Sequence, residues 1–393
     1  MTTNNECIEE WDDEQLNLKK EILRGIYSFG FETPSPIQKK ALIPMTKINK
    51  ETKKRNDILA QAQSGTGKTG CFVIGTLQII NFDLQETQAL IMAPTRELAT
   101  QIHSVITEIS KFCNINMELL MGGTPVNEDK KKLKKKPHII VGTPGRIYDM
   151  INRNYLITTG LKVVIIDEAD EMLSFGFKEQ IYNILKYMPD NIQIGLFSAT
   201  VPEQVYGLIQ TFMTDYSEIR VKNDMLTLQG IAQYYINLEN DNYKFETIKD
   251  IFGGLSISQC IIYCNTTKRV DDLQRAMEDD GFPVKKIHGK MGCEERSTIT
   301  NEFRKGSCRV LITSDLFARG IDVQQVSIVI NFDIPKSVNT YLHRIGRSGR
   351  WGRKGIAINF VTKYDCEKLK YFEQYYQTEI KEMPADFTKH ISA

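Results

Sequence analysis

Short apolar runs alternate with longer stretches of helical periodicity from about residue 38 to the end of the chain. The runs are rich in Val and Ile, which favour strands, and most are followed by enough residues for a helix. Strands connected through helices pair in parallel, and a parallel sheet needs helices over both of its faces. The pattern therefore predicts an α/β fold with mainly parallel sheets.

The predicted strands form two groups, separated by the run 216–229, which is charged and contains no clear strand. Each group occupies a stretch long enough to bury its own core. We therefore predict an N-terminal segment at 1–38, a first domain at 39–221, a linker at 222–230 and a second domain at 231–393. The predicted strands are 57–60, 89–93, 117–121, 138–141, 163–167 and 193–198 in the first group, and 260–264, 284–288, 310–313, 327–332 and 355–360 in the second.

The composition is that of a globular chain of two or three domains, with 393 residues, 41% of them hydrophobic and 25% charged. No uncharged apolar run approaches the ~18 residues that span a bilayer, and the polar, acidic N-terminus does not resemble a signal peptide. The eight cysteines and five histidines show no zinc-site spacing. We expect a cytoplasmic or nuclear protein with reduced thiols, neither secreted nor bound to a membrane.

A glycine-rich turn follows the predicted strand 57–60 directly. Its pattern fits the phosphate loop G-x-x-x-x-G-K-[ST], except that Ala62 replaces the first glycine. Backbone N–H groups in such a turn point at a bound phosphate, and the dipole of the following helix favours the anion. Lys68 is expected to reach the β- and γ-phosphates of ATP, and Thr69 to bind Mg²⁺. The loop consists of Ala62, Gln63, Ser64, Gly65, Thr66, Gly67, Lys68 and Thr69.

The sequence V-V-I-I-D-E-A-D at 163–170 supplies the acids that a phosphate loop needs on a neighbouring strand. Its carboxylates stand at the carboxyl end of a predicted strand, which is where parallel sheets bind ligands. An acidic turn of this kind also caps helices, but its combination with a phosphate loop favours catalysis. We expect Asp167 to hold Mg²⁺ and Glu168 to act as the general base for the attacking water.

A third motif, H-R-I-G-R-S-G-R at 343–350, lies in the second half of the chain. Its arginines recur every three residues, and its glycines allow a close approach of the backbone. Guanidinium groups suit the charge that develops on a transferring phosphoryl group. By itself the motif also fits a solvated basic helix end. Beside the first two motifs, we interpret it as arginine fingers that act on ATP from a second domain.

These motifs resemble those of the DEAD-box ATP-dependent RNA helicases, whose name is spelled by residues 167–170. The resemblance extends over residues 11–393, and the segments 351–361 and 372–384 resemble most the eukaryotic translation initiation factor 4A subfamily. It implies two tandem RecA-like domains, a helicase ATP-binding domain and a helicase C-terminal domain, joined by a short linker. The similar motifs are the Q motif at 30–38, motif I at 62–69, Ia at 94–99, the paired glycines at 122–123, Ib at 143–146, III at 198–200, IV at 262–265, V at 313–322 and VI at 343–350.

The resemblance also implies roles for single residues in ATP binding. Gln38 would read the adenine through its amide, with Phe31 stacked on the ring. Asp322 and Gly320 would face the ribose from the second domain. ATP and Mg²⁺ are thus the expected cofactors.

The remaining roles concern catalysis, coupling and RNA. Arg347 and Arg350 are the implied catalytic fingers. The residues that would couple the phosphate site to domain closure are Asp170, Ser198, Thr200, His343 and Arg344. The RNA contacts, made mainly to phosphates and ribose and hence independent of base sequence, are implied for Pro94, Thr95, Arg96, Gly122, Gly123, Thr143, Gly145, Arg146, Asn265, Arg296, Thr313 and Arg319.

Three features depart from the family pattern. Trp11 stands where the family usually has a Phe, with a longer spacing to Gln38. Cys293 replaces a common Gln ahead of Arg296, which puts one RNA contact in doubt. The segment 47–57 is an insertion relative to the compact family core. None of these departures touches the phosphate chemistry.

Bulk charge does not indicate a nucleic-acid partner, because 50 basic residues face 49 acidic ones. Basic residues are nevertheless concentrated at 47–57 and at 130–136. We interpret 47–57 as a surface loop, whereas 130–136 fits a solvated helix face, an added RNA contact or a nuclear-import signal. The pair Tyr375-Tyr376 is expected to pack the last helix rather than to stack on bases.

The sequence thus favours an RNA-dependent ATPase that locally unwinds short RNA duplexes or remodels RNA–protein complexes. An ATP-gated RNA clamp with partner-controlled turnover is the alternative, and a DNA translocase is disfavoured by Gln38 and the acidic motif. We expect a monomer that acts through adaptor proteins, by resemblance a scaffold of helical repeats. Translation, ribosome assembly and messenger-RNA maturation all stay open as pathways.

Overall fold

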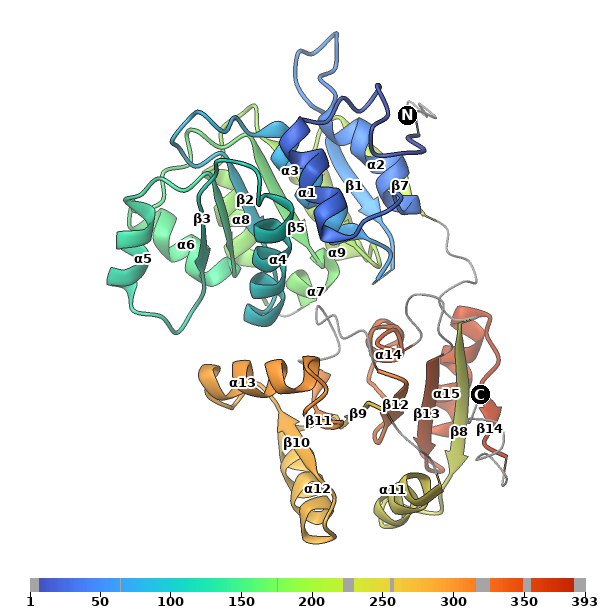
Figure 1. Ribbon diagram of the computed structural model, residues 1–393. Helices are drawn as coiled ribbons and strands as arrows, with labels where there is room; N and C mark the ends of the chain where they lie inside the picture. The colour runs from blue at the N-terminus through green and yellow to red at the C-terminus, as the bar shows by residue number, and fades with distance from the viewer. Residues whose placement is uncertain are drawn as a thin grey trace. The chain divides into compact units, whose positions relative to one another are not determined.

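The computed structural model describes residues 7–63, 65–174, 176–221, 230–254, 258–315, 326–348 and 355–384. The chain divides into two compact units, Met1–Lys222 and Asn223–Ala393 (Figure 1). Each unit is built around a parallel sheet of seven strands. The predicted α/β fold of two RecA-like domains is therefore confirmed.

The N-terminal unit has the strand order β3-β4-β2-β5-β6-β1-β7, with every neighbouring pair parallel. Nine helices described for this unit lie along the chain between and before these strands. The strands are β1 (Asp57–Gln61), β2 (Ala89–Met92), β3 (Met117–Leu120), β4 (Ile139–Gly142), β5 (Val163–Asp167), β6 (Gln193–Ser198) and β7 (Tyr216–Arg220). The helices are α1 (Lys20–Phe29), α2 (Pro36–Thr46), α3 (Lys68–Ile79), α4 (Arg96–Ile109), α5 (Val126–Leu133), α6 (Pro144–Asn152), α7 (Ala169–Ser174), α8 (Lys178–Lys186) and α9 (Glu203–Phe212).

Alternation along each strand divides the core of this unit into two layers. In β5, Val163 and Ile165 pack with α1, α2, α3 and α4, whereas Val164 and Ile166 pack with α6, α7, α8 and α9. Both faces of the sheet are thus dry, which explains why its inner strands are continuous apolar runs rather than alternating ones.

The C-terminal unit repeats this plan with the strand order β10-β11-β9-β12-β13-β8-β14, again parallel throughout. Three buried clusters fill the space between its sheet and its helices. The strands are β8 (Ile231–Asn237), β9 (Cys260–Tyr263), β10 (Val284–Ile287), β11 (Val310–Thr313), β12 (Ile328–Asn331), β13 (Gly355–Val361) and β14 (Lys381–Glu382). The described helices are α11 (Tyr243–Gly254), α12 (Thr267–Asp279), α13 (Cys293–Arg304), α14 (Val338–Ile345) and α15 (Cys366–Tyr376).

The eleven predicted strands are all present, with ends that differ by a residue or two. The prediction that the run from Tyr216 contains no strand was wrong, because β7 pairs with β1 over five residues. Strand β7 lies at the edge of the sheet, and only its Ile219 is buried. Its sequence therefore lacks the apolar run by which the inner strands were recognised. Strands β8 and β14 were missed as well. In β8 polar and aromatic residues interrupt the apolar run, and β14 has only two residues.

The strand order places three chain segments side by side at one edge of the N-terminal sheet. Strands β5, β6 and β1 are consecutive in the sheet, so the residues that follow their carboxyl ends meet there. These residues are the acidic motif, Ser198 with the segment after it, and the phosphate loop. The fold therefore assembles motifs that are far apart in the sequence.

Candidate active site and nucleic-acid surface

The phosphate loop is a tight turn between β1, which ends at Gln61, and α3, which begins at Lys68. Gly65 and Gly67 have φ angles of 81° and 96°, in the left-handed region that favours glycine. A Cβ atom on Gly67 would also lie only 2.5 Å from the Ser35 hydroxyl oxygen. Thr66 Oγ1 closes the turn by donating to the carbonyl oxygen of Gln63 at 2.7 Å. Ser64 lies outside the described residues.

The Lys68 side chain is buried at the start of α3, with only 6% of it exposed. Its ammonium lies 3.6 Å from Glu168 Oε1 and makes no hydrogen bond within the described residues. A buried ammonium without hydrogen bonds is costly, so this position favours a multiply charged anion such as a phosphate. The glycine turn, the helix N-terminus and Lys68 together fit the phosphates of a nucleotide.

Two carboxylates face this lysine at the carboxyl end of β5. Burial, followed by the charge of neighbouring Glu168, raises the pKa of Asp167 above its ordinary range, while Lys68 lowers it. A divalent cation would relieve this cost, so Asp167 fits a Mg²⁺ site. Glu168 has a φ angle of 50°, in a region that side-chain-bearing residues rarely adopt. Strain of this kind is typical of functional sites.

The predicted coupling residues of the N-terminal unit form one hydrogen-bonded group. Thr200 Oγ1 donates to Asp170 Oδ2 at 2.6 Å, and the backbone N–H of Asp170 donates to Ser198 Oγ at 3.3 Å. The carbonyl oxygen of Ser198 in turn accepts from the N–H of Ala62 at 3.1 Å. The end of β6 is thereby connected to both the acidic motif and the phosphate loop.

Gln38 lies 3% exposed on α2, next to the phosphate loop. Its Oε1 accepts from the N–H of Ser35 at 2.7 Å, which caps α2, and its Nε2 donates to the Gly67 carbonyl oxygen at 3.1 Å. Phe31 stacks on the fully buried Trp11, with ring centroids 6.2 Å apart and planes at 16°. Trp11 thus supports the aromatic ring that the sequence assigns to adenine.

Gly70 belongs to this site although the sequence did not single it out. A Cβ atom there would lie 2.7 Å from Gln38 Nε2 and 2.9 Å from Phe31 Cε2. The absence of a side chain lets the Q motif pack directly against α3. Its place directly after G-K-T is the signal that could have identified it.

The predicted RNA residues of the N-terminal unit gather at the carboxyl ends of β2, β3 and β4. Thr95 caps α4 by accepting from the Leu98 N–H at 3.2 Å, and Arg96 donates to the carbonyl oxygen of Gly122. Other residues that the resemblance assigns to RNA also follow these three strand ends: Pro94, Gly123, Thr143, Gly145 and Arg146.

Arg146 is held by a residue that the sequence did not indicate. It forms an ion pair with the fully buried carboxylate of Asp129, and its guanidinium donates to the Thr124 hydroxyl at 3.0 Å. Asp129 therefore orients Arg146. Asp129 belongs to none of the sequence motifs and directly precedes the lysine-rich run 130–136.

Arg344 organises the predicted motifs of the C-terminal unit. Its guanidinium is fully buried and donates to Asp315 Oδ1 at 2.6 Å, to Asn265 Oδ1 at 2.8 Å and to the Asp333 carbonyl oxygen at 2.8 Å. The resemblance assigned Arg344 to contacts between domains. These hydrogen bonds connect motifs IV, V and VI within the C-terminal unit, and the role of Arg344 in domain closure stays a prediction.

The other described residues of motif VI, His343 and 345–348, are also buried. Arg347 is 4% exposed and donates through Nε to the His343 carbonyl oxygen at 3.2 Å, and His343 is 1% exposed.

The remaining predicted RNA residues of this unit lie outside motif VI. Thr313 Oγ1 donates to the Ile287 carbonyl oxygen, and Arg296 NH2 lies 3.7 Å from Cys293 Sγ. The predictions for Arg319, Gly320, Asp322 and Arg350 lie outside the described residues.

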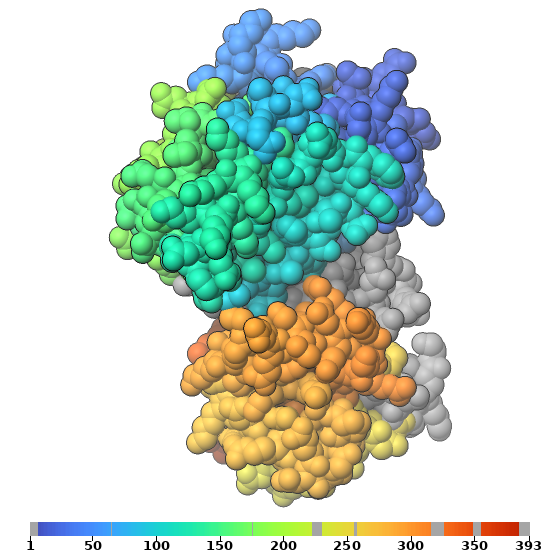
Figure 2. Space-filling view, turned by 60° about the vertical axis from the view of Figure 1, so that its left-hand side comes forward, coloured from blue at the N-terminus to red at the C-terminus, as the bar shows by residue number. Residues whose placement is uncertain are grey.

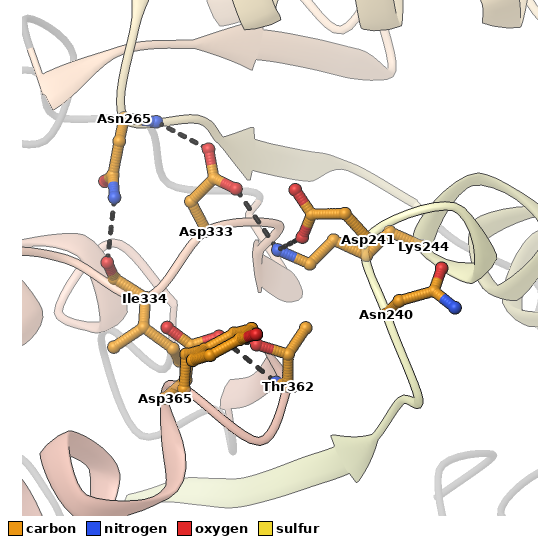
Figure 3. A pocket seen from close by; sticks show the side chains of 9 residues that line it. Asn240, Asp241, Lys244, Asn265, Asp333, Ile334, Thr362 and Asp365 are labelled. Atoms are coloured by element: carbon orange, nitrogen blue, oxygen red, sulfur yellow. Dashed lines mark hydrogen bonds and ion pairs between the residues drawn. The ribbon is translucent and has the colours of Figure 1, made fainter.

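Asn265 also borders a pocket of about 450 Å³ in the C-terminal unit (Figure 3). Lys244, Asp241 and Asp333 line the same pocket, and Lys244 forms an ion pair with each of the two aspartates. The backbone N–H of Asn265 donates to Asp333 Oδ2 at 2.9 Å, and its side chain donates to the Ile334 carbonyl oxygen. The charged groups of this pocket thus satisfy each other.

Two minor predictions concern surface features. The predicted surface loop 47–57 is exposed from 47 to 56 apart from a few half-buried residues, whereas Asp57 is buried and begins β1. Tyr376 packs α15 by donating its hydroxyl to the Val338 carbonyl oxygen at 2.8 Å, while Tyr375 is 54% exposed. Over the part of the chain that the structure describes, no helix has the length and apolar character to cross a bilayer.

Comparison with known families and proteins agrees with this geometry. The model of the DEAD/DEAH box helicase family matches residues 35–208, and that of the helicase conserved C-terminal domain matches residues 243–352. The chain is 51% identical over 379 residues to eukaryotic initiation factor 4A of Caenorhabditis elegans, covering 96% of this chain and 92% of the relative. It is 49% identical over 385 residues to ATP-dependent RNA helicase eIF4A of Scheffersomyces stipitis, covering 98% and 95%.

A solved structure gives the same result at the level of the fold. The chain is similar to S. cerevisiae Dbp5 bound to RNA and ADP BeF3, with a TM-score of 0.88 and 33% sequence identity. The match covers 96% of this chain and 98% of the Dbp5 chain.

Proposed function

The chain belongs to the DEAD-box family of ATP-dependent RNA helicases, and from this premise we propose how its residues divide the work. In our proposal the phosphate loop of the N-terminal unit binds ATP. Lys68 contacts the phosphates, while Gln38 and Phe31 contact the adenine. The burial of the Lys68 ammonium without a hydrogen bond is the observation that carries this assignment.

Thr69 and Asp167 would hold Mg²⁺, partly through water. When bound, this ion neutralises the phosphate charge and orients the γ-phosphoryl group. Glu168 would accept the proton of the attacking water. Its carboxylate lies 3.6 Å from the ammonium of Lys68, the side chain that we assign to the phosphates, and this distance supports the assignment.

We further propose that Arg347 and Arg350 of the C-terminal unit complete this site when ATP and RNA are both bound. The transferring phosphoryl group would then be neutralised from two sides. RNA would be held along the carboxyl ends of β2, β4 and β3 by phosphate and ribose contacts. The two units, once closed on ATP, would hold this RNA strand bent. A complementary strand cannot follow the bend, so short duplexes would be unwound locally.

The test is steady-state ATP hydrolysis with and without single-stranded RNA, for the wild type and for Glu168→Gln. We expect RNA to stimulate the wild type and the substitution to lower kcat by about a hundredfold or more, as general bases contribute. Glu179→Gln, an exposed residue of α8, is the matched control and should leave the rate unchanged. Unstimulated turnover with ATP-dependent retention of RNA would support the clamp alternative instead.

A further inference from the structure

A fully buried carboxylate, that of Asp129, has no role in the proposed function. It lies in the first turn of α5 and forms an ion pair with Arg146, which the resemblance assigns to RNA. Because α5 follows β3 and Arg146 follows β4, the pair lies at the carboxyl ends of these strands, beside the proposed RNA path. Helix α5 stands at the left of Figure 1, on the side that Figure 2 turns toward the viewer.

The pair holds the loop that carries the paired glycines, 122–123. The guanidinium of Arg146 donates to the Thr124 hydroxyl at 3.0 Å and to the Thr124 carbonyl oxygen at 2.8 Å. The Thr124 hydroxyl in turn donates to the Met121 carbonyl oxygen at 2.9 Å, across the two glycines. Both ends of this turn are therefore tied to one guanidinium, and Asp129 orients that guanidinium.

The loop and its neighbour present a backbone that a ligand can approach closely. Gly122, Gly123 and Gly145 are all exposed. A Cβ atom on Gly122 or on Gly145 would meet no atom within 4 Å, so the space around these two positions does not require glycine. An open, exposed backbone of this kind suits the phosphates of RNA, because N–H groups can then donate to them directly. The affinity for RNA would depend on where the loop is held.

The packing of α5 does not explain Asp129. The helix is fastened to β3 by Lys132, whose Nζ donates to the Leu119 carbonyl oxygen at 3.2 Å, and Leu133 is buried beneath it. Asp129 Oδ1 accepts no hydrogen bond within the described residues, and its ion contact to Lys132 is long, at 3.9 Å. An apolar residue would cover the sheet at a lower cost. The contact with Arg146 therefore explains this carboxylate better than packing does.

We propose that Asp129 is a positioning residue for RNA binding, which acts through Arg146 and Thr124 on the paired-glycine loop. Its side chain is fully buried, so it acts without touching RNA. Its negative charge by itself repels a polyanion, so its favourable contribution comes from geometry alone. This inference rests on the proposed function, since it assumes that RNA follows the carboxyl ends of β2, β4 and β3.

The test measures the affinity of the full chain for labelled oligouridine of about 10 nucleotides, within the range of a single binding site. Fluorescence anisotropy with a non-hydrolysable ATP analogue gives this affinity. The variant Asp129→Asn removes the charge and keeps the shape. The matched control is Asp149→Asn, because Asp149 also pairs with an arginine, Arg153 at 2.7 Å, but is 34% exposed. Nucleotide titration without RNA shows whether the N-terminal unit of each variant is folded.

We expect Asp129→Asn to weaken RNA binding by about tenfold, the order expected when a charge-assisted hydrogen bond is lost. Loss of a negative charge would by itself tighten RNA binding, so the direction of the change separates positioning from charge. The affinity for ATP should equal that of the wild type, because β2, β5 and β6 separate β4 from β1 and its phosphate loop. The control should bind RNA at least as tightly as the wild type.

Thr124 provides a second test that leaves the buried ion pair in place. Thr124→Val removes the hydroxyl that accepts from Arg146, and should weaken RNA binding by about threefold. Thr124→Ser keeps the hydroxyl and should bind RNA like the wild type. If Asp129→Asn loses ATP binding as well, the unit has unfolded and the two Thr124 variants decide the question.

Unchanged or tighter RNA binding by Asp129→Asn, with normal ATP affinity, would overturn the proposal. An equal loss of RNA binding in Asp149→Asn, or equal RNA affinities of Thr124→Val and Thr124→Ser, would overturn it too. Failure of the proposed function has a different signature: the wild type itself would not bind the oligouridine in the presence of the ATP analogue.

Discussion

In the N-terminal sheet β6 separates β1 from β5, and in the C-terminal sheet β13 separates β8 from β12 in the same way. In the N-terminal unit the phosphate loop follows β1, and the acidic motif begins at the end of β5. The arrangement in the C-terminal unit ends in the pocket of Figure 3, where Lys244 and Asp333 occupy the corresponding places. The two units thus provide the same location for a site, and differ in what fills it.

Lys68 has one ion contact, to Glu168, and no hydrogen bond within the described residues. Lys244 pairs with Asp241 at 2.8 Å and Asp333 at 3.2 Å, and Arg269 NH2 lies 2.8 Å from Asp333 as well. A network that is complete within the protein stabilises the fold, whereas an incomplete one leaves binding energy for a ligand. The sheet thus supplies the position, and the glycine turn together with the incompletely paired Lys68 supplies the site.

The largest effect is expected from Lys244→Met. Removing the ammonium leaves Arg269 as the one described cation that pairs with Asp333 and Asp241, so the free energy of unfolding of the C-terminal unit should fall by about 3 kcal/mol. Urea denaturation followed by circular dichroism measures it. The control Lys249→Met, in the same helix, removes two partly exposed ion pairs, to Glu246 and Asp280, and should cost less than about 1 kcal/mol. Equal losses would show that the network does not stabilise this unit.

Asp57 is a buried carboxylate that forms no ion pair within the described residues, so its replacement should stabilise the protein rather than destabilise it. Asp57 accepts from the Ile194 N–H at 2.7 Å, and burial followed by the charge of Asp215 raises its pKa to about 6 from 3.8. Between these pH values the folded state keeps a proton that the unfolded state has lost, so stability decreases as the pH rises. Asp57→Asn should therefore stabilise the protein above about pH 6, by up to about 3 kcal/mol, and have little effect below about pH 4.

Thermal unfolding at several pH values checks this expectation. Asp83→Asn, an exposed residue of the same unit, is the control and should show no such dependence. A gain in the stability of Asp57→Asn that does not change with pH would show that the pKa of Asp57 is not raised by folding.

A smaller effect is expected at Gly70. Its added methyl group would press on Gln38 and Phe31, so Gly70→Ala should weaken ATP binding by about tenfold through overpacking of about 1–2 kcal/mol. Gly207→Ala, inside α9 with only Tyr182 at 3.7 Å, should leave ATP binding unchanged and stabilise the helix slightly. Nucleotide titration of both variants decides whether the Q motif is packed as tightly as its geometry indicates.

The inner strands and the phosphate loop were predictable because their signals are local. Val163 to Ile166 form a continuous apolar run, and G-T-G-K-T needs its glycines for backbone reasons alone. Polar edge strands such as β7 carry no such signal. Asp129 and Gly70 depend on neighbours distant in sequence, and the closed pairing of Lys244 with Asp333 spans 89 residues, which no local pattern encodes.

We propose that, among the residues that the structure describes, only those of the N-terminal unit form an open nucleotide site. Equilibrium binding of ATP to Lys68→Ala and Lys244→Met tests this proposal most directly. We expect Lys68→Ala to weaken binding by about a hundredfold, because a phosphate loses a buried cation. Lys244→Met, measured below its unfolding temperature, should bind ATP as the wild type does. Equal loss of ATP binding in both variants, or full retention by Lys68→Ala, would contradict the claim.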